Sequence, residues 1–252
     1  MKRIIAVINQ KGGVGKTTVA FNLARGLADR GRRILAVDND PQGNLTGCLL
    51  ADPLTLTADI LRIYQEEKIN VSPQKITSAL DLIGANIHLS KVSDGDLEII
   101  FRLKEGLEQY RNEYDFIIID CLPAFGYLNM AAINASDYLI IPVNPAPFAL
   151  SGLADLFETI RKGKKRLNPD LQILGILINL VEGRRTNMGE ELAALLQQDY
   201  GELTFKTVIN KGIKIEESPA FQKSIMEYAP DSKNARQFNE FIDEFLMRIE
   251  NE

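Results

Sequence analysis

Short apolar runs alternate along the chain with segments of helical spacing. The runs lie at 4–8, 34–37, 80–84, 116–119, 138–143, 173–178 and 207–209. Their length and bulk predict buried strands. After residue 18, apolar residues recur every three or four positions, which predicts an amphipathic helix. This alternation predicts an α/β fold with a doubly wound, mostly parallel sheet and helices on both of its faces.

Four further helices are expected from spacing and capping signals. Thr57 is a candidate cap for a short helix around 60–63, and residues 96–110 place most apolar side chains on one side. Another helix begins near Ser151, and the last spans Ser232 to Ile249. The last helix carries an apolar stripe beside acidic residues, which favours packing onto the domain over binding to anionic lipid.

A glycine-rich turn follows the first predicted strand directly. It reads Asn-Gln-Lys-Gly-Gly-Val-Gly-Lys-Thr-Thr over residues 9–18. The glycines allow a tight turn with inward N–H groups, and the following helix adds the positive end of its dipole. Lys16 supplies a cation for β- and γ-phosphates, and the Thr17 hydroxyl suits Mg²⁺. A strand, this turn and a helix together predict a phosphate-binding loop.

The loop departs from the usual pattern at its beginning. Gln10 stands where that pattern has its first glycine, and Lys11 adds a second lysine. Because Lys16 already neutralises the phosphates, a second cation nearby would be repelled in an empty site. Lys11 is therefore either a solvated surface lysine or a ligand for another phosphate group.

Carboxylates follow two of the other predicted strands. Asp38 and Asp40 come after 34–37, and Asp120 comes after 116–119. Residues at the carboxyl ends of parallel strands face the ligand crevice of such a sheet. Asp38 and Asp40 share one face of an extended segment, while Asn39 points away. The alternative is that the Asp-Pro-Gln-Gly sequence at 40–43 is simply a turn. Asp120 has the position of a residue that holds an Mg²⁺-bound water.

Composition changes this picture little. The chain has 252 residues, of which 45% are hydrophobic, and a net charge of −5. These values suit a single domain over residues 1–252. No secretory signal or long apolar span is evident, so we expect a cytoplasmic protein without membrane contact. Cys48 and Cys121 lack metal-site spacing and are expected to be reduced thiols in or near the core.

The stretch at 9–18 resembles the deviant Walker A box of the ParA/MinD ATPases, and the chain resembles the ParA/Soj branch over almost its whole length. The resemblance implies an ATP- and Mg²⁺-dependent homodimer in which Lys11 reaches the partner's ATP. It also implies that Asp40 positions the attacking water and that Asp38 supports the Mg²⁺ shell. Catalysis would rest on Lys11, Lys16 and Asp40, and the metal on Thr17, Asp38 and Asp120.

The resemblance also implies a set of nucleotide contacts. These are Lys11, Gly12, Gly13, Val14, Gly15, Lys16, Thr17 and Thr18 around the phosphates, with Asn179, Ile209 and Lys211 near the adenine. For Asn179, a satisfied turn asparagine is an almost equal alternative. The chain departs from the family pattern at Asn39, Leu122, Ala146 and Asn210. It resembles the short form of the family, without an N-terminal DNA-reading domain.

Local charge raises the question of DNA binding. Residues 161–185 carry seven basic and two acidic residues. The candidate contacts are Lys164, Lys165, Arg184, Arg185, Lys211 and Lys214. Basic residues at a helix end also complement the macrodipole and need no partner. With the resemblance, we expect weak, salt-sensitive, sequence-independent binding to duplex DNA in the ATP state.

The leading interpretation is a DNA partition ATPase, associated with the nucleoid and stimulated by a ParB-like partner. The family resemblance leaves open a relative that positions a protein cargo instead of DNA. A nucleotide-dependent scaffold with little or no hydrolysis is the second hypothesis. A small-molecule ATP-dependent ligase on the same fold is the third.

Overall fold

The fold is known from a computed structural model that describes residues 2–65, 71–92, 97–124, 126–145, 149–182 and 187–251. Within these ranges, eight strands form one sheet in the order β3-β4-β2-β5-β1-β6-β7-β8. Their bounds are β1 (Arg3–Val7), β2 (Ile34–Asn39), β3 (Gln74–Lys75), β4 (Leu80–Ile83), β5 (Phe116–Cys121), β6 (Tyr138–Val143), β7 (Gln172–Val181) and β8 (Thr204–Asn210). All neighbours pair in parallel except β3 with β4. The predicted mostly parallel sheet is confirmed.

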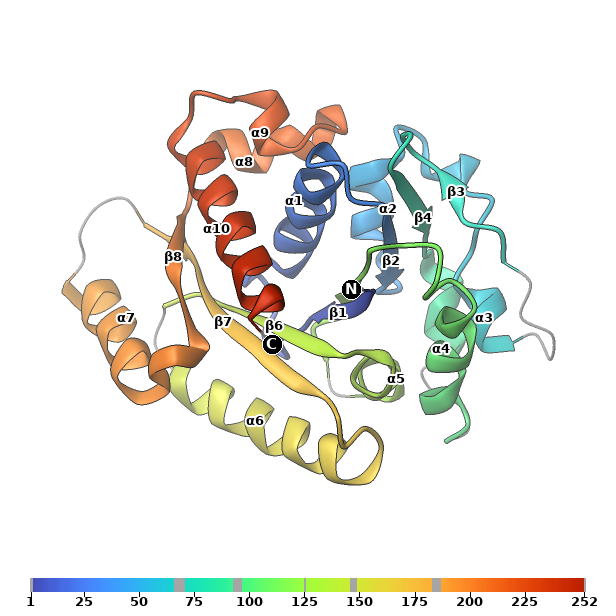
Figure 1. The fold of residues 1–252 in the computed structure, drawn as a ribbon, viewed down its shortest axis with the longest axis horizontal. Coiled ribbons are helices and arrows are strands. Elements are labelled where there is room, and N and C mark those ends of the chain that lie inside the picture. The colour runs from blue at the N-terminus through green and yellow to red at the C-terminus, as the bar shows by residue number, and fades with distance from the viewer. Residues whose placement is uncertain are drawn as a thin grey trace.

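Helices cover both faces of this sheet (Figure 1). On one face lie α1 (Lys16–Asp29), α2 (Asn44–Leu49), α8 (Ile213–Glu217), α9 (Ile225–Tyr228) and α10 (Lys233–Glu250). The other face carries α3 (Leu61–Gln65), α4 (Ile99–Glu108), α5 (Tyr127–Ala135), α6 (Ala149–Arg166) and α7 (Asn187–Tyr200). Short 3-10 turns span Pro53–Thr55, Ile87–Val92, Gly201–Leu203 and Ser218–Phe221.

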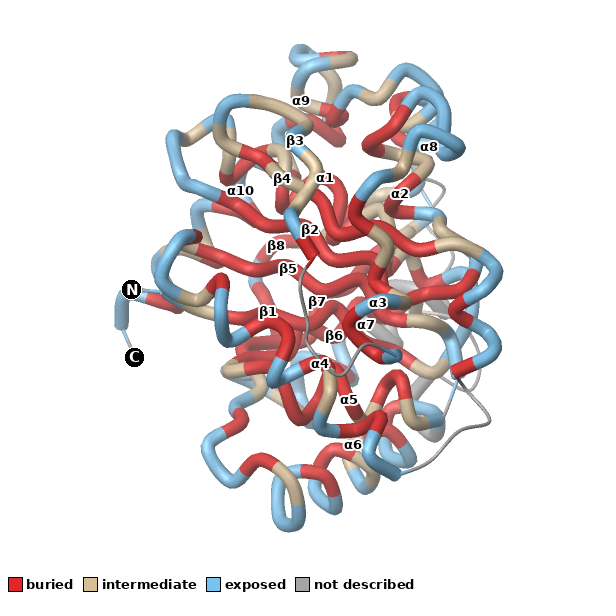
Figure 2. Tube along the Cα trace, turned by 90° about the vertical axis from the view of Figure 1, so that its right-hand side faces the viewer, coloured by how far each residue is buried: buried red, intermediate tan, exposed pale blue. Residues whose placement is uncertain are grey.

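The central strands are buried on both faces (Figure 2). In β1, Ile5 and Val7 pack beneath the helices of one face, while Ile4 and Ala6 pack beneath those of the other. Alternate side chains of a strand point to opposite faces, so a strand covered on both sides needs apolar residues at every position. This explains why the strands appear in the sequence as continuous apolar runs.

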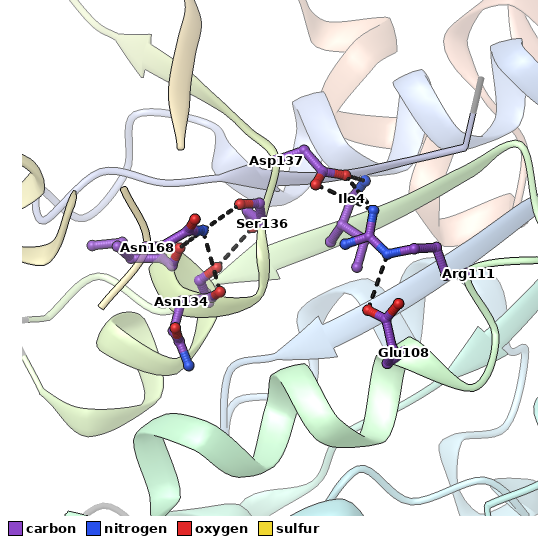
Figure 3. Close-up of polar contacts among 9 residues, drawn as sticks. Ile4, Glu108, Arg111, Asn134, Ser136, Asp137 and Asn168 are labelled. Atoms are coloured by element: carbon purple, nitrogen blue, oxygen red, sulfur yellow. Dashed lines mark hydrogen bonds and ion pairs between the residues drawn. The ribbon is translucent and has the colours of Figure 1, made fainter. Parts of the chain in front are cut away.

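The amino edge of the sheet is fastened by polar side chains (Figure 3). Asp137 Oδ2 accepts a hydrogen bond from Ile4 N at 2.7 Å and forms an ion pair with Arg111 at 2.9 Å. Beside it, the buried Asn168 amide donates to three carbonyls, those of Ile133, Asn134 and Ser136. These structural contacts occupy the amino edge of the sheet, so the candidate site is sought in the loops at the carboxyl edge.

Helix α10 packs onto the domain as predicted and also covers the outer strand β8. Phe238, Phe241 and Phe245 are fully buried. The Glu244 carboxylate accepts hydrogen bonds from Lys206 N and Thr207 N at 2.9 and 3.0 Å. The backbone of an edge strand therefore finds its partners in helix side chains.

Two predicted details of the short helices are wrong. Thr57 does not cap α3, because its N–H and hydroxyl both donate to Gln74 Oε1. Asp59 takes that place and accepts a hydrogen bond from Leu61 N at 2.9 Å. Helix α4 is also shorter than the predicted 96–110, and residue 96 lies outside the described residues.

Both cysteines are free thiols, Cys121 buried and Cys48 partly buried, as expected. Burial is the main reason that the pKa of Cys48 rises to about 12. Across the described ranges, no helix is both long enough and apolar enough to span a lipid bilayer.

Candidate nucleotide-binding site

The glycine-rich loop ends at the amino terminus of α1. Gly13 and Gly15 have φ angles of 73° and 85°, in the left-handed region that favours glycine. Gly15 is the N-cap of α1, and neither a capping side chain nor an acidic residue occupies the first turn. The helix thus presents its first N–H groups and its positive dipole end to a ligand. This geometry fits phosphate.

Two asparagines brace the loop, Asn9 from its first position and Asn179 from β7. Asn9 Nδ2 donates to Pro142 O at 2.8 Å, and Asn9 Oδ1 accepts from Lys11 N at 2.9 Å. Asn179, which is fully buried, donates to Val14 O at 2.8 Å. It lies so close beneath the loop that a Cβ on Gly15 would stand 2.4 Å from its Nδ2. The loop is held in shape by contacts to β6 and β7.

The two lysines of the loop occupy different environments. Lys16 is 7% exposed, and its Nζ donates to Lys11 O at 3.0 Å. Burial lowers the pKa of Lys16, while the nearby Asp120, Cys121 and Asp40 act in the opposite direction. The Lys11 side chain is exposed. Lys16 therefore lies inside the loop, and Lys11 lies at its surface.

Asp120 is a buried carboxylate without a well-formed hydrogen bond among the described residues. Neither of its oxygens has a partner, although the Thr17 hydroxyl is close enough to lower its pKa. Burial, and then the charge of Asp38, raise its pKa overall. Asp38 is its neighbour because the two residues pair in register across β2 and β5. Orphaned carboxylate oxygens beside a threonine hydroxyl fit an Mg²⁺ ion, which takes few protein ligands.

Asp38 differs from Asp120 because its oxygens are used within the protein. Oδ2 accepts from Thr46 N and from the Thr46 hydroxyl, both at 2.8 Å, and Oδ1 accepts from Asp40 N at 3.2 Å. Burial raises the pKa of Asp38 to about 6. A carboxylate has about four lone-pair sites, so these bonds leave room for a bridging water. Asp38 fastens the loop between β2 and α2.

Asp40 is the first residue of that loop and is 6% exposed. Its Oδ1 accepts from Gln42 N at 2.9 Å, and its carbonyl accepts from Gly43 N at 2.9 Å. Asp-Pro-Gln-Gly is thus a turn, and the turn places the Asp40 carboxylate close enough to Lys16 to affect its pKa. Residues 40–43 can therefore form a turn and also supply a carboxylate to the site.

The predicted adenine residues flank the carboxyl ends of β7 and β8. Asn179 braces the loop through Nδ2, while its buried Oδ1 has no partner among the described residues. Ile209 is fully buried in the core, which leaves only its backbone for a ligand. Lys211 is exposed, and its N–H donates to Val181 O at 2.9 Å. Their roles toward adenine stay predictions.

The four described candidates for DNA binding lie at opposite edges of the sheet. Lys164 and Lys165 lie in the last turn of α6, which precedes β7 and so ends at the amino edge of the sheet. Lys211 and Lys214 follow the carboxyl end of β8. Arg184 and Arg185 lie outside the described residues, as does Ala146. Chain topology alone could have separated the two groups.

Sequence reasoning assigned no contacts to two asparagines of this region. Asn39 is fully buried and donates to Leu128 O at 2.9 Å, while its Oδ1 accepts from Tyr64 OH at 2.7 Å. Asn129 donates to the carbonyls of Leu122 and Ala124 in the loop after β5. For Asn39 the available signal was an amide between two carboxylates, and for Asn129 it was an asparagine in a mostly apolar helix.

No three His, Cys, Asp or Glu side chains come together as a metal site in the part of the chain that the structure describes. A cation that relies on phosphate oxygens for most of its ligands does not require such a group.

Comparison with known proteins agrees with this geometry. The family model described as AAA domain matches residues 2–173. The sporulation initiation inhibitor protein Soj of Bacillus subtilis is 38% identical, over 97% of this chain and 98% of its own. The chromosome-partitioning ATPase Soj of Thermus thermophilus is 35% identical, over 98% and 97%.

A solved structure extends the comparison to bound nucleotide. Cobyrinic acid a,c-diamide synthase from Mycobacterium smegmatis, with ADP and magnesium, is similar with a TM-score of 0.81 and 30% identity. The match covers 99% of this chain and 96% of that one. A similar structure therefore holds a nucleotide together with a magnesium ion.

Proposed function

This chain belongs to the ParA/Soj family of chromosome- and plasmid-partitioning ATPases, within the ParA/MinD deviant Walker A superfamily, and it is an ATPase. From this premise we propose that ATP and Mg²⁺ join two copies of the chain into a dimer that binds DNA without sequence preference. A ParB-like partner then stimulates slow hydrolysis and release.

The observation that carries the proposal is the contrast between the two loop lysines. Lys16 lies inside the loop and bonds to the Lys11 carbonyl, whereas the Lys11 side chain is exposed at the loop surface. A loop that already contains its own cation does not need a second one for the same phosphates. The exposure of Lys11 supports the proposal that it stabilises charge on a nucleotide held by another copy, as an arginine finger does.

The remaining roles follow from the carboxylates. Asp120 and the Thr17 hydroxyl would hold Mg²⁺, with Asp38 supporting its water shell. The ion would neutralise phosphate charge as hydrolysis proceeds. Asp40, in the loop between β2 and α2, orients the attacking water. Residues 9–18 bind and orient the triphosphate, and Lys16 neutralises its outer phosphates.

DNA binding rests on family membership and on the basic residues. Of the described candidates, Lys211 and Lys214 lie at the same sheet edge as the nucleotide loop, so a change there upon ATP binding can reach them. Contacts of this kind are made to phosphates and weaken steeply with salt. The proposal includes association with the nucleoid.

The test is light scattering of the purified protein with Mg²⁺ and either ATP or ADP. ATP should double the mass, and ADP should leave a monomer. Lys11→Ala should bind a fluorescent ATP analogue normally yet remain monomeric, and Lys16→Ala should lose nucleotide binding. A monomer with ATP demonstrably bound would refute the dimer, and full turnover by Lys16→Ala would refute the site.

Asp40→Ala addresses hydrolysis separately. This variant should dimerise with ATP and fail to release phosphate, so that the dimer persists. Normal phosphate release would remove Asp40 from its proposed role. Dimerisation without phosphate release by the wild-type chain, even with duplex DNA and a ParB-like partner, would favour the scaffold alternative.

The small-molecule ligase, the third hypothesis, is kept as a candidate because the similar Mycobacterium smegmatis structure is that of a diamide synthase. The two functions differ in what stimulates turnover. Duplex DNA should raise phosphate release by a partition ATPase and leave a ligase unchanged.

A further inference from the structure

Asn39 is the last residue of β2 and stands between Asp38 and Asp40, but its side chain points to the opposite face of the sheet from Asp38. Asp38 and Asp120 pair in register, and Asp38 bonds to Thr46 on the α1 and α2 side. Asn39 pairs with Cys121, and its side chain contacts α3 and α5 instead. The residue thus connects the strand end that carries the carboxylates with the helical layer behind it.

The orientation of the Asn39 amide follows from its partners. The Leu128 carbonyl, 2.9 Å away, can only accept, so the nitrogen of the amide must face it. The amide oxygen then faces Tyr64 OH and accepts a hydrogen bond from it at 2.7 Å. Asn39 is fully buried and Tyr64 is 5% exposed. Buried hydrogen bonds of this kind are costly to break and fix geometry.

The first turn of α5, to which Asn39 is hydrogen-bonded, is also hydrogen-bonded to the loop between β5 and α5. Asn129, next to Leu128, donates to Leu122 O at 3.0 Å and to Ala124 O. Within this loop, Pro123 Cβ lies 3.9 Å from where a Cβ on Gly12 would be. One turn of helix is therefore bonded to the end of β2 on one side and to the loop behind the phosphate-binding turn on the other.

We propose that Asn39 is a positioning residue that keeps Asp38 and Asp40 in fixed alignment with the end of β5, which carries Asp120, and with the loop that follows it. The inference rests on the proposed hydrolysis at Asp40. The Asn39 side chain points to the opposite face of the sheet from Asp38, so it acts through the end of β2, which Asp40 directly follows. A displacement of 1 Å in such a site can lower a rate by about 100-fold.

The test compares two buried asparagines that hold opposite ends of α5. Asn39→Leu removes the bond to the first turn, and Asn134→Leu removes a bond from the last turn to Ile100 O of α4 at 3.1 Å. Asn134 lies at the amino edge of the sheet, near Asn168 (Figure 3). Both variants lose a buried amide hydrogen bond, so both should lower the Tm.

Only Asn39→Leu should change the chemistry. Its kcat for phosphate release with Mg²⁺, ATP and duplex DNA should fall about tenfold, while its KM for ATP stays within about twofold. Asn134→Leu should keep the wild-type kcat. Equal kcat values for the two variants, or a loss confined to KM, would overturn the inference.

A second pair covers the case in which Asn39→Leu does not fold. Tyr64→Phe removes only the hydroxyl that Asn39 accepts from, and Tyr114→Phe removes a hydroxyl that donates to Asp81 at 2.7 Å away from the site. Tyr64→Phe should lower kcat about threefold and Tyr114→Phe should not. An unchanged kcat in Tyr64→Phe would also overturn the inference. Absent turnover in the wild-type chain would instead count against the proposed function.

Discussion

Gly15 occupies the tightest point of the nucleotide loop, so replacing it with alanine tests the loop geometry directly. Its φ angle of 85° lies in the left-handed region. An added Cβ would stand 2.4 Å from Asn179 Nδ2, well inside van der Waals contact. The methyl group must therefore push the Asn179 side chain away, and this breaks the bond from Asn179 to Val14 O.

The loss of stability has two parts. A left-handed conformation disfavours a residue with a Cβ by about 1–2 kcal/mol. Losing the buried hydrogen bond between Asn179 and Val14 removes about 1 kcal/mol more. The free energy of unfolding should fall by about 2–3 kcal/mol in total, which lowers the Tm by roughly 5–10 °C for a chain of this length.

Urea unfolding followed by circular dichroism measures this loss, and Gly31→Ala is the matched control. Gly31 has a φ of 77° and nothing within 4 Å of an added Cβ. Gly31→Ala should therefore show the backbone part alone, about 1–2 kcal/mol. It should bind ATP normally, whereas Gly15→Ala should bind it more weakly because the first turn of α1 has moved.

A double-mutant cycle with Asn179→Ala isolates the contact. Removing the Asn179 amide gives the new methyl group room, so Gly15→Ala should destabilise the Asn179→Ala background by about 1 kcal/mol less than the wild type. If Gly15→Ala proves no more destabilising than Gly31→Ala, the close packing of Asn179 beneath the loop is refuted.

Two further predictions concern buried carboxylates. Asp120→Asn should raise the stability of the nucleotide-free protein by about 1 kcal/mol, because burial and the charge of Asp38 disfavour an ionised carboxylate at this position, and it should abolish phosphate release. For Glu244, burial raises the pKa, but hydrogen bonds from Lys206, Thr207 and Arg248 outweigh it and lower the pKa below 4.5. The stability it contributes is present above pH 4.5 and lost as pH falls through the lower folded pKa, so Glu244→Gln should be less stable than wild type at neutral pH and approach it in acid.

Thermal and urea unfolding across pH, with parallel phosphate assays, checks both carboxylates. Asp115 is a suitable control for Asp120, because Asp115 lies at the start of β5 and its carboxylate accepts from Arg33 N at 2.8 Å. Asp115→Asn should leave phosphate release unchanged and give no stability gain. A less stable Asp120→Asn protein, or a constant difference between Glu244→Gln and wild type from pH 7 to pH 3, would contradict the reasoning.

The sheet could be predicted from the sequence because its strands carry a signal at every position. Side chains of β1 and β5 are buried on both faces, so the runs 4–8 and 116–119 stand out without regard to partners. The phosphate loop was equally local, since Gly13, Gly15 and Lys16 act within one turn. Features that depend on a few neighbouring residues can be predicted from the sequence alone.

The errors and omissions depend on residues far apart in the chain. Thr57 is a good cap in isolation, but Gln74 takes its donors. The role of Asn39 requires Tyr64 and Leu128, which lie 25 and 89 positions further along the chain. Neither set of contacts affects the local spacing of apolar residues, because both form between segments that are far apart in the chain.

The outer side of β8 has a consequence for how copies of this protein can associate. Glu244 and Arg248 take up backbone N–H groups and the Thr204 carbonyl, which an unprotected edge would offer to a strand from another molecule. Growth by strand addition is thereby blocked at that end. The described outer side of β8 therefore offers little backbone for the open-ended strand pairing that produces fibres.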